Sequence, residues 1–268
     1  MASDLAILAC GGALPVQIAA AHPTALRLSL RGVPHQLGDT TQEHRIEQMG
    51  ALFDAMKAAD VTRIVFAGGL ARPALDPSAL DAVTMGIAPK LMAGFKAGDD
   101  ALLGQVIDIF EEQGFAVVGA HELLPDLTAD EALKVGATPS ADDLKDADRA
   151  WDILNALSPL DVGQGCVVAA GQCLGIETIQ GTDALLRFVG QTEDRLRQGA
   201  RGVFVKAAKR GQDLRVDMPT IGPKTIEAVV QAGLAGLVIE AGRVMILDRG
   251  ATLEAVEKAG LFLSSRVM

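Results

Sequence analysis

The stretch LAILACGGALPVQIAAA, residues 5–21, decides the fold. Its first five residues are all apolar, as in a buried strand, and Cys10-Gly11-Gly12 then predicts a turn. Residues 13–21 follow as a short helix, so the stretch has the strand, turn and helix order of an α/β layer. We predict that such βα units build the amino-terminal part of the protein.

The same alternation continues through the first half of the chain. The expected strands cover 26–30, 63–67 and 115–118, and the expected helices cover 42–59 and 101–113. Between residues 123 and 141 the composition changes to proline and glycine among acids, which is typical of a crossing between domains. We therefore expect one domain over 1–130 and a second over 131–268.

In the second half of the chain, we expect some strands to pair as hairpins and others to be connected through helices. The expected elements are helices over 144–157, 183–198 and 223–232, a strand over 202–206, and hairpins formed by 165–170 with 174–179 and by 237–240 with 244–247. The fold class is thus α/β with two domains: an amino-terminal, sandwich-like layer of βα units, and a carboxy-terminal domain with a mixed sheet.

Composition and charge limit the classes of function. Hydrophobic residues make up 49% of the 268-residue chain and charged residues 22%, which is typical of a folded globular protein. The net charge of −10 argues against a nucleic-acid binder that gains affinity by neutralising phosphates. A phosphorylated ligand would have to be held by backbone amides, a few local cations or a metal ion.

The cysteines and the apolar runs bear on the cellular location. Cys10, Cys166 and Cys173 form no CxxC pair, so we expect small buried side chains in a reducing compartment and neither a disulfide framework nor a zinc site. The amino terminus has too short an apolar run for a signal peptide, and no stretch reaches about 18 uninterrupted apolar residues. We expect a cytoplasmic protein.

The segment QDLRVDMP, residues 212–219, carries the sharpest chemical signal. In an extended strand, alternation would place Asp213, Arg215 and Asp217 on one face. Carboxylates spaced in this way would lie roughly 6 to 7 Å apart and could share a divalent cation, for which Mg²⁺ or Mn²⁺ is the natural choice. The alternative is a solvated strand face with an ordinary Asp–Arg ion pair.

Two glycine loops follow predicted strands and could receive a phosphate. Gly11-Gly12 and Gly68-Gly69, the second with Arg72 nearby, would form a crevice at one end of the sheet. Neither loop has the third glycine of GxGxxG or the lysine of a P-loop, which disfavours a dinucleotide-dependent oxidoreductase. Tight turns without a ligand are the alternative.

A helix start after the acidic segment could also receive a phosphate. Gly222-Pro223 is a plausible cap and first turn, and a helix amino terminus attracts anions. The alternative is a capped helix without a ligand. Lys206 or Arg215 could neutralise further charge on a bound phosphate.

Taken together and in order, these segments resemble one family, the UDP-2,3-diacylglucosamine pyrophosphatases of the LpxI type. The matching pieces are Gly11-Gly12-Ala13-Leu14-Pro15, Phe66-Ala67-Gly68 with Arg72-Pro73, Gly98-Asp99-Asp100-Ala101-Leu102-Leu103, His121-Glu122-Leu123-Leu124-Pro125, Asp161-Val162-Gly163-Gln164, Glu177 with Gly181-Thr182-Asp183, and Gln212-Asp213 through Gly222. Each piece is weak alone, but the ordered set spans nearly the whole chain and is specific.

The resemblance implies hydrolysis of UDP-2,3-diacylglucosamine to UMP and 2,3-diacylglucosamine 1-phosphate (lipid X) in lipid A biosynthesis. It also implies magnesium as cofactor, water as nucleophile, and Asp217 as the leading catalytic or metal-binding acid, with Asp213 and Arg215 beside it. The residues expected to bind substrate are Gly11, Gly12, Ala13, Gly68, Gly69, Arg72, Glu122, Gln164, Thr182, Asp183, Lys206, Thr220 and Gly222.

A lipid-linked substrate further implies peripheral association with the inner-membrane surface, and the sequence leaves a homo-oligomer open. The alternative function is a non-catalytic nucleotide- or lipid-binding protein that uses the same glycine loops.

Overall fold

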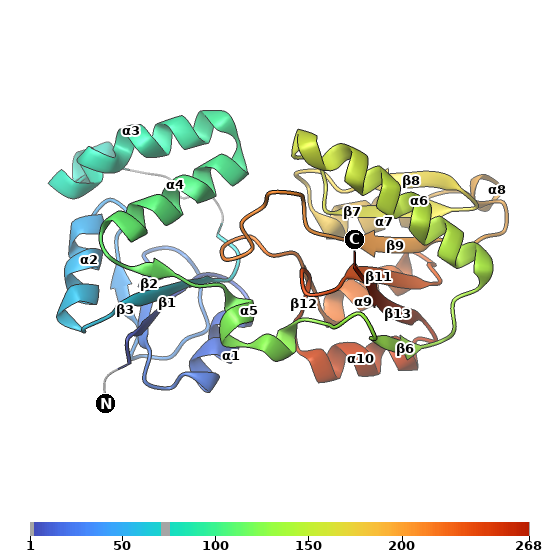
Figure 1. Cartoon of the computed structure of the whole chain (residues 1–268), viewed down its shortest axis with the longest axis horizontal. Coiled ribbons are helices and arrows are strands. Elements are labelled where there is room, and N and C mark those ends of the chain that lie inside the picture. Colours follow the sequence, from blue (N-terminus) through green and yellow to red (C-terminus); the bar gives the residue numbers. More distant parts are fainter. Residues whose placement is uncertain (1–2, 71–75, 268) are drawn as a thin grey trace. The chain divides into compact units, whose positions relative to one another are not determined.

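The computed structural model describes residues 3–70 and 76–267. The chain forms two compact units (Figure 1). The first contains the chain up to Pro125 together with Asp213–Asp217, and the second contains Asp126–Gln212 and the chain from Met218 onward. Among the described residues, no helix has the length and apolar character to cross a membrane.

The first unit is built on a five-stranded parallel sheet. In spatial order its strands are β3 (Gln42–His44), β2 (Leu26–Leu30), β1 (Leu5–Ala9), β4 (Arg63–Ala67) and β5 (Ala116–Val117). All five residues of β1 are buried, as its unbroken apolar run predicts. The chain builds outward from β1 in both directions, so the space beside the carboxyl ends of β1 and β4 is a topological switch point, where open α/β sheets bind ligands.

Five α-helices accompany this sheet in the described part of the first unit. They are α1 (Leu14–Ala21), α2 (Met49–Ala58), α3 (Ala82–Ala97), α4 (Asp99–Glu112) and α5 (Ala120–Leu123). The predicted helix over 42–59 is wrong at its start, because residues 42–44 pair with β2 and the helix begins only at Met49. The sequence analysis did not predict α3, whose mostly apolar sequence lacks a clear polar face.

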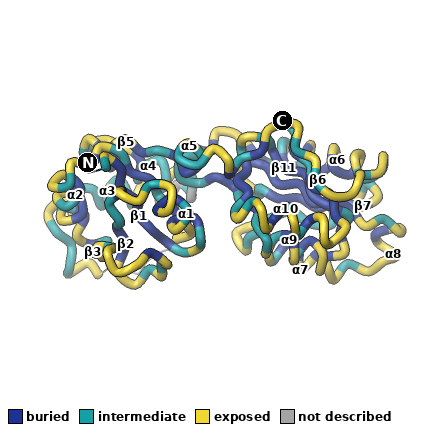
Figure 2. The backbone as a smooth tube through the Cα atoms, turned by 90° about the horizontal axis from the view of Figure 1, so that it is seen from below, coloured by how far each residue is buried: buried dark blue, intermediate teal, exposed yellow. Residues whose placement is uncertain are grey.

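Aromatic side chains fill the core of the first unit. Phe53 on α2 and Phe110 on α4 meet edge to face with ring centroids 5.1 Å apart, and Phe66 on β4 meets Phe110 in the same way at 5.0 Å. Phe53 and Phe110 are at most 2% exposed, and complete burial of such a side chain stabilises a fold by about 1.5–3 kcal/mol. Figure 2 shows the buried strands inside each unit in dark blue.

The second unit contains a six-stranded mixed sheet, as predicted. In spatial order its strands are β6 (Lys134–Gly136), β13 (Phe262–Arg266), β11 (Gly236–Glu240), β9 (Val203–Lys206), β7 (Gly165–Ala169) and β8 (Gln172–Ile176). β13, β11 and β9 are parallel, whereas β6, β7 and β8 join by antiparallel pairing. The short strands β10 (Thr220–Ile221) and β12 (Met245–Ile246) form a separate parallel pair.

Helices cover both faces of this sheet. They are α6 (Ala141–Leu157), α7 (Thr182–Gly190), α8 (Asp194–Arg197), α9 (Pro223–Gln231) and α10 (Arg249–Lys258). Short 3-10 helices also occur in the two units, at Pro77–Ala79, Pro125–Leu127 and Ser158–Leu160. Trp151 and Leu154 of α6 pack with Cys166, Val168 and Val205 of the sheet, while α7, α9 and α10 contribute to the core that contains Val167 and Phe204. Alternate residues of β7 therefore face opposite cores, as strand geometry requires.

Two predictions for this unit are wrong in detail. The expected hairpin of 237–240 with 244–247 does not form, because both edges of β11 are occupied by β9 and β13, and β12 pairs with β10 instead. The expected helix over 183–198 is divided into α7 and α8, since α7 ends at Gly190 and glycine disfavours continuation of a helix. The hairpin of β7 and β8 and the helix that begins at Pro223 agree with prediction.

Candidate functional site

The two glycine loops pair directly with each other at the carboxyl ends of β1 and β4. Gly11 N–H donates to the Gly69 carbonyl and Gly69 N–H donates to the Gly11 carbonyl, each over 3.1 Å. A Cβ atom at Gly68, where φ is +94°, would lie 2.1 Å from the Gly11 carbonyl oxygen. Glycine is therefore required at Gly68 by its positive φ and by the close approach of the other loop.

This pair of loops lies at the switch point of the first sheet and leads into α1. Ala13 is the N-cap of α1 without a side-chain cap hydrogen bond, and Pro15 stands in the first turn. Gly12 has φ +96° and open space where a Cβ would be. Gly11, Gly12, Ala13, Gly68 and Gly69 thus come together as predicted, in the position where α/β sheets receive phosphate groups. Arg72 lies outside the described residues.

The acidic segment Asp213–Asp217 is a turn and not the extended strand that alternation predicts. The Asp213 carboxylate accepts from the backbone N–H of Arg215 at 3.0 Å. The backbone N–H groups of Val216 and Asp217 donate to the Asp213 carbonyl at 3.3 and 3.2 Å. Aspartate commonly forms such local bonds to its own backbone, and here they replace the strand, so the alternating faces do not exist.

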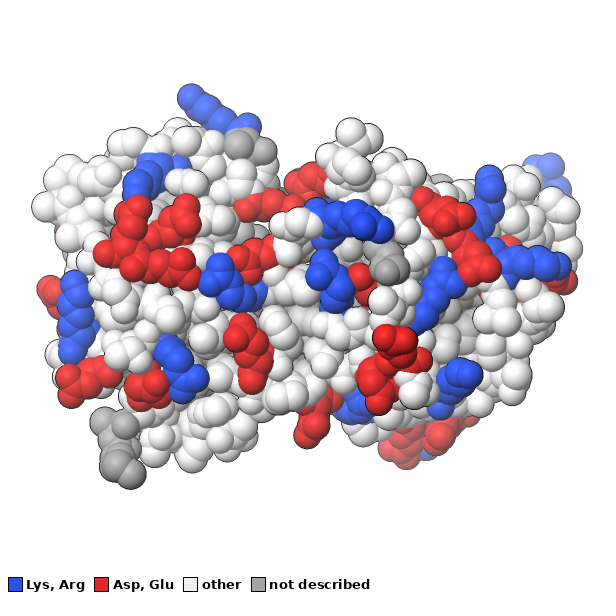
Figure 3. Space-filling view, viewed as in Figure 1, with Lys and Arg blue, Asp and Glu red and all other residues white. Residues whose placement is uncertain are grey.

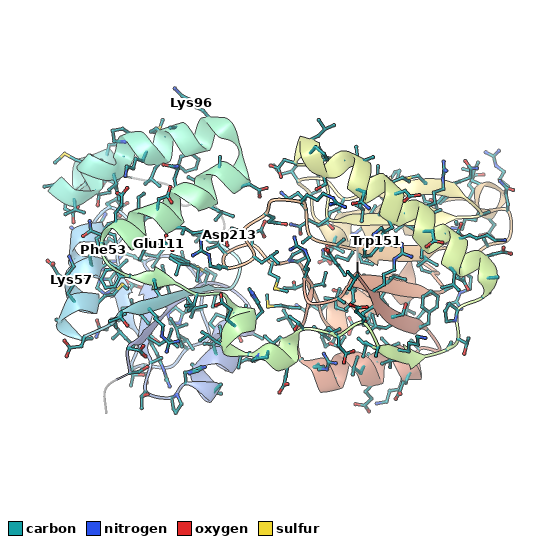
Figure 4. The ribbon with its side chains drawn as sticks, viewed as in Figure 1. Phe53, Lys57, Lys96, Glu111, Trp151 and Asp213 are labelled. Carbon is teal, nitrogen blue, oxygen red and sulfur yellow. The ribbon has the colours of Figure 1, made fainter. Side chains whose placement is uncertain are left out.

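Arg215 ties this turn to the first unit. Its guanidinium donates to Asp213 through Nε and Nη2, at 3.0 and 2.7 Å, and through Nη1 to Glu111 on α4 at 2.8 Å. A longer bond from Nη1 reaches the carbonyl of Val117 at 3.4 Å. Figure 4 labels Glu111 and Asp213, the two acids that Arg215 joins. We expected Asp213 and Asp217 in the second domain, but the segment Asp213–Asp217 packs with the first unit.

Electrostatics at the turn keep Asp213 ionised. The hydrogen bonds from Arg215 hold the pKa of the Asp213 carboxyl below its usual value against a smaller effect of burial, and His121 adds a favourable charge. The same hydrogen bonds raise the pKa of Arg215. Val216 packs against the hydrophobic core of the first unit, so the turn is held by apolar contact as well.

The pairing with Arg215 decides how Asp213 could take part in metal binding. The structure has the Asp–Arg ion pair, the alternative left open by the sequence, and both Asp213 oxygens accept from Arg215. Within residues 3–70 and 76–267 there is no cluster of three or more His, Cys, Asp or Glu side chains that could hold a metal. Mg²⁺ commonly uses one or two carboxylates and completes its shell with waters and substrate phosphates. Asp217, the other acid expected to bind the metal, is half-buried at the end of the turn, and its backbone N–H donates to the Asp213 carbonyl.

A second cluster lies in the second unit around a buried lysine. Lys206 at the end of β9 has a side chain that is only 5% exposed, and its ammonium group donates to Glu177 at 3.2 Å and to the Thr182 hydroxyl. Glu177 follows β8, and Thr182 is the first residue of α7. A Cβ at Gly165 would lie 2.6 Å from the Glu177 carboxylate, so this glycine leaves room for the carboxylate.

Two further predicted residues lie next to members of this cluster, one through a backbone hydrogen bond and one in the chain. The Gln164 carbonyl accepts from the N–H of Ala207, directly after Lys206. Asp183 is exposed in the first turn of α7, one residue after Thr182. The structure thus brings Thr182 and Lys206 into contact, pairs the Gln164 backbone with the residue after Lys206, and places Asp183 next to Thr182 in the chain.

The other predicted residues have structural partners. Glu122 accepts from the N–H of Gly119 at 2.7 Å and caps α5. Thr220 lies in β10 opposite Met245. Gly222 is the N-cap of α9, and its N–H donates to the Thr225 hydroxyl at 3.2 Å.

A buried acid that was not predicted positions the chain between Lys206 and the acidic turn. Glu240, at the end of β11, is 4% exposed and accepts from the N–H of Ala208 at 2.9 Å. Its other oxygen pairs with Arg243 at 3.0 Å. An acid that directly ends an apolar run, as in GLVIE, was the available signal, because a carboxylate there needs a buried partner.

Comparison with known proteins identifies the family. The family model described as the LpxI N-terminal domain matches residues 4–127, and the one described as the LpxI C-terminal domain matches residues 130–264. The chain is 37% identical over 268 residues to UDP-2,3-diacylglucosamine pyrophosphatase LpxI of Caulobacter vibrioides, covering 97% of this chain and 96% of that protein. With both domains present in order and this level of identity along the whole length, the chain belongs to the LpxI family.

Proposed function

We propose that this protein hydrolyses the pyrophosphate bond of UDP-2,3-diacylglucosamine and releases UMP and 2,3-diacylglucosamine 1-phosphate, a step of lipid A biosynthesis. The observation that carries the proposal is the 37% identity to a pyrophosphatase of that name over 97% of the chain. The two paired glycine loops, at a position where α/β sheets bind phosphates, are consistent with a nucleotide-linked substrate. The alternative, a binding protein without catalysis, has no comparable support.

The substrate presents negative charge that must be offset before water can attack. Arg215 and Lys206 are the cations of the two clusters, and each already neutralises a neighbouring carboxylate. The guanidinium of Arg215 uses Nε, Nη1 and Nη2 for protein acceptors. We infer that it acts chiefly as a positioning residue for the turn, while Asp217 at the end of the turn faces the chemistry.

We further propose that the reaction depends on Mg²⁺ or Mn²⁺. Carboxylate oxygens are hard donors that suit these ions, and Asp217 is the side chain that would hold the ion, with Asp213 contributing if it exchanges its bond to Arg215. A bound divalent ion supplies positive charge for the non-bridging phosphate oxygens and lowers the pKa of a coordinated water. The turn orients Asp217 through its N–H, which donates to the Asp213 carbonyl.

The test is UMP release by the purified full-length protein. Wild-type protein should turn over UDP-2,3-diacylglucosamine, lose this activity on chelation and regain it with added Mg²⁺ or Mn²⁺. Asp217→Asn should keep the fold and lose at least roughly 100-fold in kcat, as expected when the carboxylate that would hold a charge-stabilising ion is removed. Near-normal turnover by Asp217→Asn would refute the role of this acid. Turnover that is indifferent to chelation would refute the metal.

We also propose that the protein works at the cytoplasmic surface of the inner membrane, where a diacylated substrate would be embedded. An exposed apolar stripe on α3 supports this. Met85, Pro89 and Met92 recur at helical spacing and are all exposed, with Met85 57% and Met92 55% exposed, and the exposed Lys96 continues the same spacing. Lys96 projects from the end of this helix (Figure 4).

The charge on α3 favours binding to an anionic lipid surface. Although the chain has a net charge of −10, residues 82–96 contain two lysines and no acid. On the face drawn in Figure 3, acidic and basic side chains are otherwise interspersed. Lys90 is paired with Glu112 of α4, so Lys96 supplies the positive charge for anionic headgroups, and the exposed apolar side chains of α3 can enter the headgroup boundary.

Vesicle sedimentation tests this surface. Wild-type protein should co-sediment with vesicles of phosphatidylethanolamine and phosphatidylglycerol, and Met85→Glu/Met92→Glu should sediment much less. Ile179→Glu is a matched control, because Ile179 is 90% exposed but belongs to the second unit and not to α3. Equal sedimentation of the α3 variant and the control would contradict the proposal.

A further inference from the structure

Two cysteines face each other across the β7–β8 hairpin. The Sγ atoms of Cys166 on β7 and Cys173 on β8 are 3.9 Å apart. Cys166 is fully buried, whereas Cys173 is exposed to solvent. The pairing of the strands is irregular between Val167 and Val168, so that Val168 lies opposite Cys173. Cys166 and Val168 project to the same side of β7, which brings the two sulfur atoms together.

The pKa values of the two thiols are shifted in opposite directions. The hydrogen bond from Cys166 lowers the pKa of Cys173 to about 6, and Arg149 on α6 contributes a favourable charge. The same interaction, together with burial, raises the pKa of Cys166. Of the two, the exposed Cys173 is therefore the sulfur that loses its proton more readily, and the buried Cys166 is the one that keeps it. An exposed thiolate beside a positive charge is the arrangement of a reactive cysteine.

The hairpin turn beside the pair is firmly held. Ala170 and Gly171 have positive φ, as two-residue hairpin turns require. The Asp146 carboxylate on α6 accepts from both of their N–H groups, at 3.0 and 2.7 Å. The turn thus fixes the register of the strands, and only the side chains and the irregular part of the ladder need to adjust when the sulfur atoms approach.

We propose that Cys166 and Cys173 are a modification site that forms a reversible intramolecular disulfide when the protein reacts with a peroxide. The Cys173 thiolate attacks one peroxide oxygen, the O–O bond breaks, and the second oxygen leaves as water after taking up a proton. Cys173 is then a sulfenic acid. The Cys166 sulfur attacks the sulfur of Cys173, the S–O bond breaks, and the hydroxyl group leaves as water with the proton of Cys166. The two thiols together lose two electrons, which reduce one peroxide to two waters.

This modification is compatible with a reducing cytoplasm. Cytosolic disulfides are usually transient, and a thiol such as dithiothreitol reverses them by exchange. The sulfur atoms must approach by roughly 2 Å to reach a bond length near 2.05 Å. The proposal is independent of the catalytic role proposed above, because the test measures covalent linkage and not turnover.

The experiment is titration of the reduced full-length protein with hydrogen peroxide, followed by intact-mass measurement and peptide mapping without reductant. We expect loss of two hydrogen atoms, a peptide pair linked through Cys166 and Cys173, and full reversal by dithiothreitol. Cys166→Ala should stop at a Cys173 sulfenic acid that dimedone captures. Cys10→Ser is the matched control and should form the disulfide as wild type does, since Cys10 is buried in the first unit.

Several outcomes would overturn the proposal. They are accumulation of a Cys173 sulfinic acid while Cys166 stays reduced, chains linked through Cys173 as the main product, and a linkage that includes Cys10. If Cys166→Ala fails to fold, the wild-type peptide map and the Cys10→Ser control still decide between these results.

Discussion

Replacing Gly68 by alanine should destabilise the first unit more than the same change at Gly12. Both glycines have nearly the same positive φ, +94° and +96°. A Cβ in this backbone region costs about 1–2 kcal/mol for an L-residue, and that cost is common to both positions. The surroundings differ, because a Cβ at Gly12 would meet nothing within 4 Å, whereas a Cβ at Gly68 would lie 2.1 Å from the Gly11 carbonyl oxygen.

The additional cost at Gly68 follows from the geometry. A carbon and a carbonyl oxygen rarely approach closer than about 3.3 Å, so the two loops would have to separate by roughly 1 Å. That movement breaks the reciprocal hydrogen bonds between Gly11 and Gly69. Each contributes about 0.5–1.5 kcal/mol net, so Gly68→Ala should cost about 1–3 kcal/mol more than Gly12→Ala.

The assay is urea unfolding followed by circular dichroism, with tryptophan fluorescence as an internal reference. The only tryptophan, Trp151, lies on α6 of the second unit and reports on that unit. Hydrogen exchange of peptides from β1 and β4 should show the local loss of protection in Gly68→Ala. Equal stability of Gly68→Ala and Gly12→Ala, with equal protection of β1 and β4, would refute the close approach of the loops.

Three other predictions concern charged groups and a thiol. Asp213→Asn should destabilise the first unit at neutral pH, because the pKa of Asp213 is lowered in the folded protein. The stability that Asp213 contributes is present above its unfolded pKa near 3.9 and is lost as the pH falls through its folded pKa. The urea midpoints of wild type and variant should therefore converge in acid. Lys206→Met should lower the free energy of unfolding of the second unit by about 3–5 kcal/mol, because the nearly buried Glu177 loses its ion pair. Urea unfolding should show that the double variant Lys206→Met/Glu177→Leu recovers part of this loss. Alkylation of Cys173 by iodoacetamide should reach half its maximal rate near pH 6, and a midpoint near the usual thiol value of about 8.5 would contradict the lowered pKa.

The features that follow from local sequence were predicted well. The apolar run before Gly11-Gly12 gave β1, its turn and α1, because a buried strand and a tight turn each have a direct signature. The start of α9 at Pro223 followed from the preference of proline for the first helical turn. The switch point itself depends on the order of strands in space, which the sequence alone does not determine.

The acidic turn shows where periodicity misleads. Alternation over the few residues from Asp213 to Asp217 is equally compatible with a strand and with a turn in which an aspartate bonds to its own backbone. The deciding contacts, from Arg215 to Glu111 and from Val216 to the aromatic core, join positions about one hundred residues apart in sequence. No local pattern contains them.

The lysine cluster was found only in part for a related reason. Lys206 and Thr182 were selected as substrate-binding residues, but their contact with each other and with Glu177 arises from the order β9, β7 and β8 in the sheet. Glu240 was missed because its partner, the N–H of Ala208, becomes its neighbour only when β11 and β9 pair.

Phosphorus NMR of UDP-2,3-diacylglucosamine incubated with the purified protein and Mg²⁺ tests the central claim most directly. Cleavage should replace the pair of coupled pyrophosphate resonances by two phosphomonoester signals, one from UMP and one from the lipid product, in equal amounts. Pyrophosphate resonances that only broaden or shift, with no phosphomonoester formed, would show a protein that binds this molecule and does not cut it.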